Sequence, residues 1–350
     1  MYERMMTMIK RGKVIAVFSI IIALTFAFTG CIVNTNPAVR VNDTELTKDE
    51  YGYYLYIQMS QTLQEAGVNV NDADAIEKYL DGETDGVKNI DIIREKAAEE
   101  GANLLVQYSK AKELGIELSE DDKASIEAEI SGMKQQVGGD KGYKAQLATF
   151  GTTPEAFESL YEKNTLVSKL TERLVEDGTT AATDAEVEDY IRKNYIKAAH
   201  ILFLTQDQQT GASFDEATIA QKRQQAEDTL AKINGGEDFN KLMKELSEDT
   251  GLEAYPDGYE FTKGQMVPQF EEAAFALEEN KVSGIVETSY GFHIIKRLPF
   301  EITDAKIQEY KADAKMACEY EKFELLTQQW KESCEIEIFK SVIKSVKPNI

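Results

Sequence analysis

The stretch Glu287-Thr288-Ser289-Tyr290-Gly291-Phe292-His293-Ile294-Ile295-Lys296 is the most informative one in this 350-residue chain. It predicts the end of one strand, 285–288, and the start of another, 292–298, with a histidine among apolar residues. The other histidine of the chain, His200, lies in a second short apolar run, 198–204. A single buried histidine is usually structural, but here both fall in predicted strands of one segment. We therefore predict that His200 and His293 meet in one sheet.

The residues between the two histidines alternate between helical and extended patterns. The first strand is followed by a polar loop, and the first helix has a natural end at Gly235-Gly236. The predicted elements are a strand at 198–204, a loop at 205–213, helices at about 215–233 and 238–246, a turn at Asp257-Gly258, and a helix at 269–277. This order predicts an α+β module of about 100 residues, which is a normal size for a domain.

The sequence before this module is almost entirely helical. Thr47 and Glu50 have the spacing of a capping box, in which each residue satisfies a backbone amide of the other. Similar helix starts occur at Ser119, Thr153 and Thr183. No strand-rich patch interrupts this region, so we expect a helical N-terminal part.

The sequence after the module returns to helix. A long helix is predicted from 303 to about 333, followed by an alternating apolar segment at 336–346. Neither flank has the pattern of a separate strand-rich core. We therefore predict that the module, 196–299, is inserted in a mostly α-helical, chaperone-like body. This body would consist of an N-terminal region, 38–195, and C-terminal helices, 300–350, that pack on it.

The first 30 residues have the features of a secretion signal. Basic residues at positions 10, 11 and 13 precede an apolar run at 14–28, which is shorter than the ~20 residues of a membrane span. Thr29-Gly30-Cys31 resembles the bacterial lipobox. The resemblance implies a signal peptide at 1–30, a lipid on the Cys31 sulfur and a tether at 31–37. The protein would then be anchored to the cell membrane on its extracytoplasmic face. A plain signal peptide and an uncleaved anchor are the alternatives.

The charge of the chain limits its partners. It has 62 Asp and Glu residues against 39 Lys and Arg residues, which gives a net charge of −23 at pH 7. Binding to nucleic acid requires a basic surface, so we predict no nucleic-acid partner. An acidic surface favours solubility and basic or unfolded polypeptide partners.

Cysteine and histidine usage limits the metal chemistry. The two histidines could ligate a metal, but the segment 196–299 contains no cysteine and no acidic residue at a clear ligand spacing. We therefore predict no metal site. Cys318 and Cys334 are too few for a disulfide scaffold and are interpreted as unpaired or structural, although the sequence leaves a pairing open.

Four motifs, in the same order as in the family, resemble those of the parvulin-family peptidyl-prolyl isomerases. They are the strand 197–203 with His200, Ser247-Glu248-Asp249, Gly264-Gln265-Met266-Val267-Pro268-Gln269-Phe270-Glu271, and the stretch 287–296 with Thr288 and His293. The resemblance covers about 196–298. Together with the lipobox and the helical flanks, the chain resembles PrsA-type foldases and, more loosely, SurA-like chaperones.

The resemblance implies an enzyme that isomerises X-Pro peptide bonds. It places Met266 and Phe270 where the prolyl ring is held, and it implies a catalytic group of His200, Asp249, His293 and Thr288. Rotation about a peptide bond has a barrier of about 18–20 kcal/mol, and uncatalysed X-Pro isomerisation is slow enough to limit folding. Catalysis needs an apolar grip on the ring and preorganised dipoles around the twisting amide, but no covalent step and no cofactor.

The chain departs from the family at one point and lacks one optional feature. Many parvulins have Gly-Asp-Leu-Gly where this chain reads Pro256-Asp257-Gly258-Tyr259, so a pocket leucine falls on Gly258. Either Tyr259 fills that space as a substrate-binding residue, or the pocket is open on that side. Phosphate-directed parvulins have basic residues in the loop after the first strand, whereas 205–213 contains Asp207 and no Lys or Arg. We expect no preference for phosphorylated substrates.

Two further functions remain as alternatives to an isomerase acting on unfolded or newly secreted polypeptides. The first is a non-catalytic holdase chaperone with an inactive parvulin module. The second, a solute-binding lipoprotein, should show alternating strands and helices over most of the chain, and the N-terminal region lacks them. The sequence leaves the oligomeric state open, including a homodimer.

Overall fold

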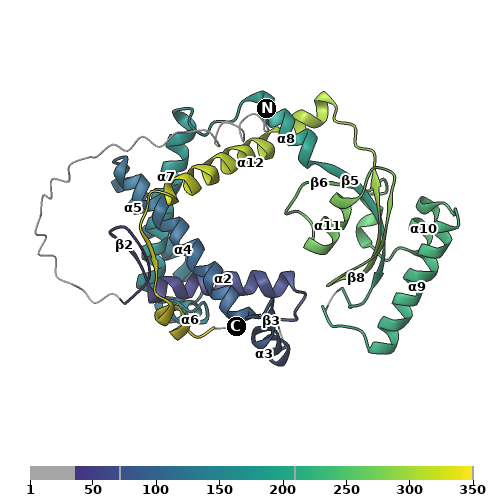
Figure 1. The fold of residues 1–350 in the computed structure, drawn as a ribbon, viewed down its shortest axis with the longest axis horizontal. Helices are drawn as coiled ribbons and strands as arrows, with labels where there is room; N and C mark the ends of the chain where they lie inside the picture. Colours follow the sequence, from purple (N-terminus) through teal and green to yellow (C-terminus); the bar gives the residue numbers. More distant parts are fainter. Residues whose placement is uncertain (1–35, 71, 209, 349–350) are drawn as a thin grey trace, which may run out of the picture. The chain divides into compact units, whose positions relative to one another are not determined.

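The computed structural model describes residues 36–70, 72–208 and 210–348 (Figure 1). The predicted signal peptide and the predicted lipid attachment at Cys31 lie outside the described residues. Within the part of the chain that the structure describes, no helix is long and apolar enough to cross a membrane.

The N-terminal region is built mostly of helices, and the longest of them is α4. The helices are α2 (Lys48–Glu65), α3 (Ala73–Asp81), α4 (Asn89–Glu113), α5 (Glu120–Gln136), α6 (Asp140–Thr149), α7 (Pro154–Glu176) and α8 (Asp184–Asn194). The helix starts predicted at Thr47, Ser119, Thr153 and Thr183 are confirmed, because each of these side chains accepts a backbone amide at the helix N-terminus. Three of the four are complete capping boxes.

The region is almost entirely helical, as predicted, and it also contains one small hairpin that the sequence did not indicate. Between α3 and α4 lies a short hairpin of β3 (Glu83–Thr84) and β4 (Val87–Lys88). Its turn consists of Asp85 and Gly86, and both have positive φ, 52° and 79°. A two-residue turn of this type joins strands too short to show an alternating pattern.

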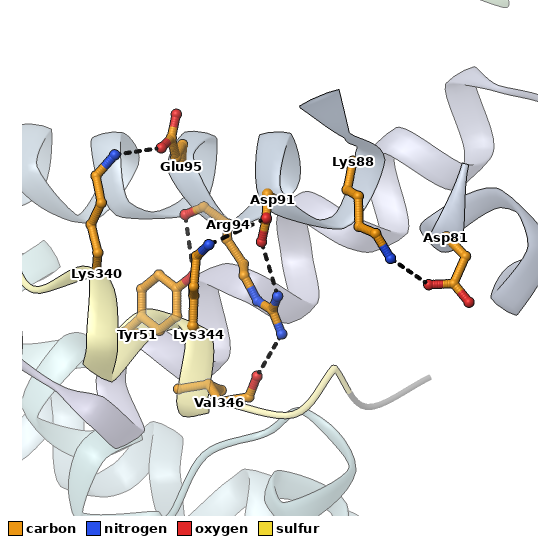
Figure 2. Close-up of polar contacts among 9 residues, drawn as sticks. All are labelled: Tyr51, Asp81, Lys88, Asp91, Arg94, Glu95, Lys340, Lys344 and Val346. Atoms are coloured by element: carbon orange, nitrogen blue, oxygen red, sulfur yellow. Dashed lines mark hydrogen bonds and ion pairs between the residues drawn. The ribbon is translucent and has the colours of Figure 1, made fainter. Parts of the chain in front are cut away.

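The end of the chain completes the N-terminal core. Strand β9 (Ile336–Ile338) pairs antiparallel with β1 (Pro37–Val41), which also pairs with β2 (Thr44–Thr47). Helix α13 (Lys340–Ser345) then lies along α4 (Figure 2).

Ion pairs and buried side chains hold α13 to α4. Lys340 forms an ion pair with Glu95 at 3.0 Å and Lys344 with Asp91 at 3.4 Å, and Figure 2 shows both pairs. In the same view, the Arg94 guanidinium donates to the carbonyl of Val346. The side chain of Val346 and that of Ile343, on α13, are buried in the same core as β1 and α4. The two sequence segments on either side of the module therefore form one body.

Helix α12 (Asp304–Lys331) contacts both α4 and α8. In its second half Phe323 is buried in the N-terminal core, and Gln107 of α4 donates to the Thr327 hydroxyl at 3.1 Å. In its first half Ala314 packs with the buried side chains of α8. Cys318, on the same helix, is buried, and it and Cys334 are both free thiols.

The inserted module is a four-stranded antiparallel sheet covered by helices on both faces. The strand order is β6 (Tyr259–Phe261), β5 (Ile196–Leu204), β8 (Gly291–Leu298) and β7 (Val282–Thr288). The helices are α9 (Glu216–Asn234), α10 (Phe239–Leu246), the 3₁₀ turn η2 (Thr250–Glu253) and α11 (Pro268–Ala276). Figure 1 shows α9 and α10 on one side of the sheet and α11 on the other.

Alternation along the two central strands divides their side chains between the two faces. Ile201 and Ile294 face α9 and α10 in one buried cluster, whereas Ala198 and Ile295 face α11 in another. Because side chains alternate along a strand, His200 and His293 also belong to the α11 face. The α+β fold class, a small sheet-and-helix module within a helical body, is confirmed.

Candidate active site

The two histidines meet on the α11 face of the sheet. In the β5–β8 ladder His293 lies opposite Leu202, and His200 lies opposite Ile295, so the two imidazoles are diagonal neighbours. Their rings stack with centroids 5.2 Å apart, and the two Nδ1 atoms are 3.0 Å apart. Both side chains are buried.

A carboxylate continues this contact on one side. Asp249 Oδ2 is 3.1 Å from His200 Nε2, and it accepts a hydrogen bond of 2.6 Å from the Tyr259 hydroxyl. Asp249 Oδ1 accepts the Gly251 amide at 2.9 Å, so Asp249 also caps the η2 turn. Burial by itself would raise the pKa of Asp249, but the hydrogen bonds from His200, Tyr259 and Gly251 outweigh it and lower the pKa to about 2. The group is therefore a carboxylate at neutral pH.

A hydroxyl continues the contact on the other side. Thr288 Oγ1 lies 2.8 Å from His293 Nε2, and both groups are buried. Burial first, and the neighbouring His200 second, lower the pKa of His293 to about 3. His293 is therefore neutral over the physiological pH range.

The Asp249 carboxylate fixes the direction of the whole chain, because it can only accept hydrogen bonds. With one proton on each ring, His200 donates from Nε2 and accepts on Nδ1. His293 then donates from Nδ1 and accepts on Nε2 from the Thr288 hydroxyl, whose oxygen accepts the Tyr290 amide at 3.1 Å. Every donor faces an acceptor, so one set of tautomers satisfies the buried chain.

Phe270 covers both imidazoles. Its ring meets His200 edge-on at 5.1 Å between centroids and His293 at 5.4 Å. Met266 packs against the same buried cluster, which also contains Phe261 and Ile295. The structure thus brings the predicted apolar residues and the predicted polar residues into one place.

Comparison with known proteins agrees with this geometry. The model of the PPIC-type PPIase domain matches residues 186–298, and that of the SurA-like N-terminal domain matches residues 1–171. Foldase protein PrsA of Exiguobacterium sibiricum is 30% identical over 67% of this chain and 69% of its own length. The chain belongs to the PrsA foldase family.

Other PrsA proteins match over different shares of their length. Foldase protein PrsA of Clostridium kluyveri is 27% identical over 92% of this chain and 96% of its own. That of Halalkalibacterium halodurans is 32% identical, and the match spans 59% of each chain. The PPIC-type domain makes this PrsA-family protein a peptidyl-prolyl cis–trans isomerase that assists protein folding. The predicted family and enzyme class are thus confirmed, and no comparison favours the inactive holdase.

The departure from the parvulin pattern at Gly258 has a structural explanation. Gly258 has a φ of 93°, and a Cβ there would lie 2.7 Å from the carbonyl oxygen of Ala198. A side chain at this position would collide with the backbone of β5, which explains why the chain has glycine here. Tyr259, the next residue, is half-buried beside His200, with ring centroids 5.7 Å apart.

Sequence reasoning missed two residues that position Asp249 in this PrsA-family site. The Leu202 amide of β5 donates to Ser247 Oγ at 3.1 Å, and the Leu204 amide donates to Glu248 Oε2 at 2.8 Å. β6 pairs only with the start of β5. Further along the same edge, the backbone of β5 is hydrogen-bonded by the loop of Ser247 and Glu248 instead. The motif Ser247-Glu248-Asp249 was visible, but it does not indicate which members bind the strand.

The imidazole nitrogens of both histidines already have hydrogen-bond partners within the protein. Both nitrogens of His200 and of His293 lie at hydrogen-bond distance from a partner in the chain described above. Among the described residues, no group of three or more His, Cys, Asp or Glu side chains is arranged to hold a metal ion.

Proposed function

We propose that the site on the α11 face performs the isomerisation, with Met266 and Phe270 holding the prolyl ring above the histidine pair. The single observation that supports this most strongly is the satisfied chain from Thr288 through His293 and His200 to the Asp249 carboxylate. A continuous buried network of this kind has one arrangement, which gives the substrate a preorganised polar floor.

The proposed role of Asp249 is electrostatic. In a planar amide the carbonyl oxygen carries partial negative charge, and twisting about the C–N bond removes part of it because resonance is lost. A fixed carboxylate near that oxygen repels the planar form more than the twisted one. The barrier falls because the interaction differs between ground and transition states. Since the bond only rotates, no group needs to attack the substrate.

The proposed function is tested by isomerisation of proline-containing peptides in matched unphosphorylated and phosphorylated forms. We expect the protein to catalyse Ser-Pro isomerisation and to gain nothing from a phosphate on that serine. The loop 205–213 offers Asp207 and no Lys or Arg, so the phosphate has no cationic partner there. A several-fold preference for the phosphorylated peptide would contradict this.

The same preparation separates the isomerase from a holdase. Suppression of aggregation of an unfolded client, together with no peptide isomerisation by the folded protein, would contradict the proposed function. A net charge of −23 supports basic, newly secreted polypeptides as clients.

The proposed location is the extracytoplasmic face of the cell membrane, with the lipid on Cys31 and a tether that ends near residue 37. This rests on the order of features in the first 31 residues, in which basic residues are followed by an apolar run and then by Thr29-Gly30-Cys31. Mass spectrometry of membrane-extracted protein should find a diacylglyceryl group on an N-terminal Cys31, and Cys31→Ser should abolish it. An unmodified Cys31 inside a longer chain would contradict the proposal.

A further inference from the structure

The backbone before β6 aims Tyr259 into the active site. Gly258 adopts a positive φ against the carbonyl of Ala198, which turns the chain sharply onto the edge of β5. Tyr259 opposite Ala198 then lies on the α11 face, while Glu260 points away and accepts the hydroxyl of Tyr310 of α12 at 2.6 Å. The ring of Tyr259 therefore has a fixed direction.

The hydroxyl of Tyr259 reaches Asp249 through a space that Gly251 leaves open. A Cβ on Gly251 would lie 2.1 Å from the Tyr259 hydroxyl oxygen and 3.3 Å from Asp249 Oδ1. Gly251 does not have a positive φ, so its backbone conformation alone does not demand glycine. The absence of a side chain at 251 is what allows the 2.6 Å hydrogen bond.

This hydrogen bond acts on the same oxygen that faces His200. Oδ2 of Asp249 accepts both the Tyr259 hydroxyl and His200 Nε2, while Oδ1 accepts the Gly251 amide. Three donors from three separate segments hold the carboxylate. They fix the orientation of the side chain and favour its ionised form. The titratable groups around it are His200 and His293 of the central strands, Tyr259, and Tyr255, whose ring is tilted against that of Tyr259 with centroids 4.9 Å apart.

We propose that Tyr259 is a positioning residue of the isomerase, which holds the Asp249 carboxylate against His200 and so sets the tautomers of both histidines. Gly251 is the second part of this device, because it makes room for the hydroxyl. The inference rests on the proposed role of Asp249 in isomerisation. It assigns Tyr259 a role through Asp249, separate from any contact with substrate.

The test is Tyr259→Phe, which keeps the ring and removes the hydroxyl. We expect kcat/KM on an unphosphorylated peptide to fall about 10-fold, the size of one lost hydrogen bond to a charged group. The chain has two histidines, so a long-range ¹H–¹⁵N spectrum contains two imidazoles. The wild-type spectrum should show His200 protonated on Nε2 and His293 on Nδ1, and in the variant the His200 signals should move toward a tautomer mixture.

Gly251→Ala and Tyr255→Phe complete the experiment. Gly251→Ala should reproduce both defects, because its Cβ displaces the hydroxyl, and should add nothing in the Tyr259→Phe background. Tyr255→Phe, at an exposed neighbouring ring, should match the wild type. A wild-type rate and spectrum for Tyr259→Phe, or full additivity of Gly251→Ala, would overturn the inference. If the wild-type protein fails to isomerise peptides, the proposed function fails. The imidazole spectra of the wild type and of Tyr259→Phe still show whether Tyr259 holds Asp249 against His200.

Discussion

Asp249→Asn should lower kcat/KM by about 100-fold, which is the effect of removing one preorganised electrostatic group from an active site. The substitution keeps the shape of the side chain but removes the charge. It also leaves one acceptor oxygen where the structure uses two, since Oδ1 accepts the Gly251 amide and Oδ2 accepts His200 and Tyr259. In one orientation of the amide the NH₂ group faces the Gly251 amide, and in the other it faces both His200 and Tyr259, so at least one donor loses its acceptor. The measurement is peptide isomerisation at neutral pH.

The matched control for Asp249→Asn is Glu253→Gln, which removes one negative charge from the exposed end of the same turn. We expect this control to keep the wild-type rate. Asn is also a good cap for a helical turn, so circular dichroism and the melting temperature of Asp249→Asn should stay close to wild type. If the folded variant isomerises peptides as fast as the wild type, Asp249 has no part in the mechanism.

Removal of residues 303–350 should unfold the helical body and leave the inserted module folded. The deletion removes the buried side chains of Phe323, Ile343 and Val346 from the main core, and it exposes the edge of β1 that β9 covers. Each such side chain contributes about 2–5 kcal/mol, and the whole stability of a domain is about 5–15 kcal/mol. The expected loss is therefore as large as the whole free energy of unfolding of the helical body, so the body should unfold.

The module should survive this deletion because its two buried clusters contain no residue beyond Leu298. Hydrogen exchange followed by mass spectrometry can report the two parts separately. Protection should be lost in α2, α4 and α7 and retained in β5 and β8. Unchanged protection in α4 would show that the C-terminal segment is not part of the core.

A pair of point variants gives the same answer without truncation. Ile343→Ala should lower the stability of the helical body by about 2–5 kcal/mol, because the side chain is 2% exposed. Leu325→Ala on α12, whose side chain is 61% exposed, should change it by about 0.5 kcal/mol or less. Equal melting temperatures for the two variants would contradict the proposed packing.

The sequence by itself determined the features that depend on neighbouring residues. The helix starts at Thr47, Ser119 and Thr183 were predictable because a capping box is completed within four residues of chain. The strand predicted at 198–204, which the structure extends to 196–204, and the helix end at Gly235 were predictable from an apolar run and from glycine for the same reason. The order of the four motifs also indicated which side chains the site contains.

Only the tertiary structure decided how these side chains meet. His200 and His293 are 93 positions apart, and their Nδ1 atoms face each other because the β5–β8 register makes them diagonal neighbours. The hydroxyl of Tyr259 reaches Asp249 because Gly251 leaves space and Gly258 turns the chain, and no local pattern encodes either distance. Pairing between distant segments depends on the packing of the whole core, so a single sequence indicates the partners but not their contacts.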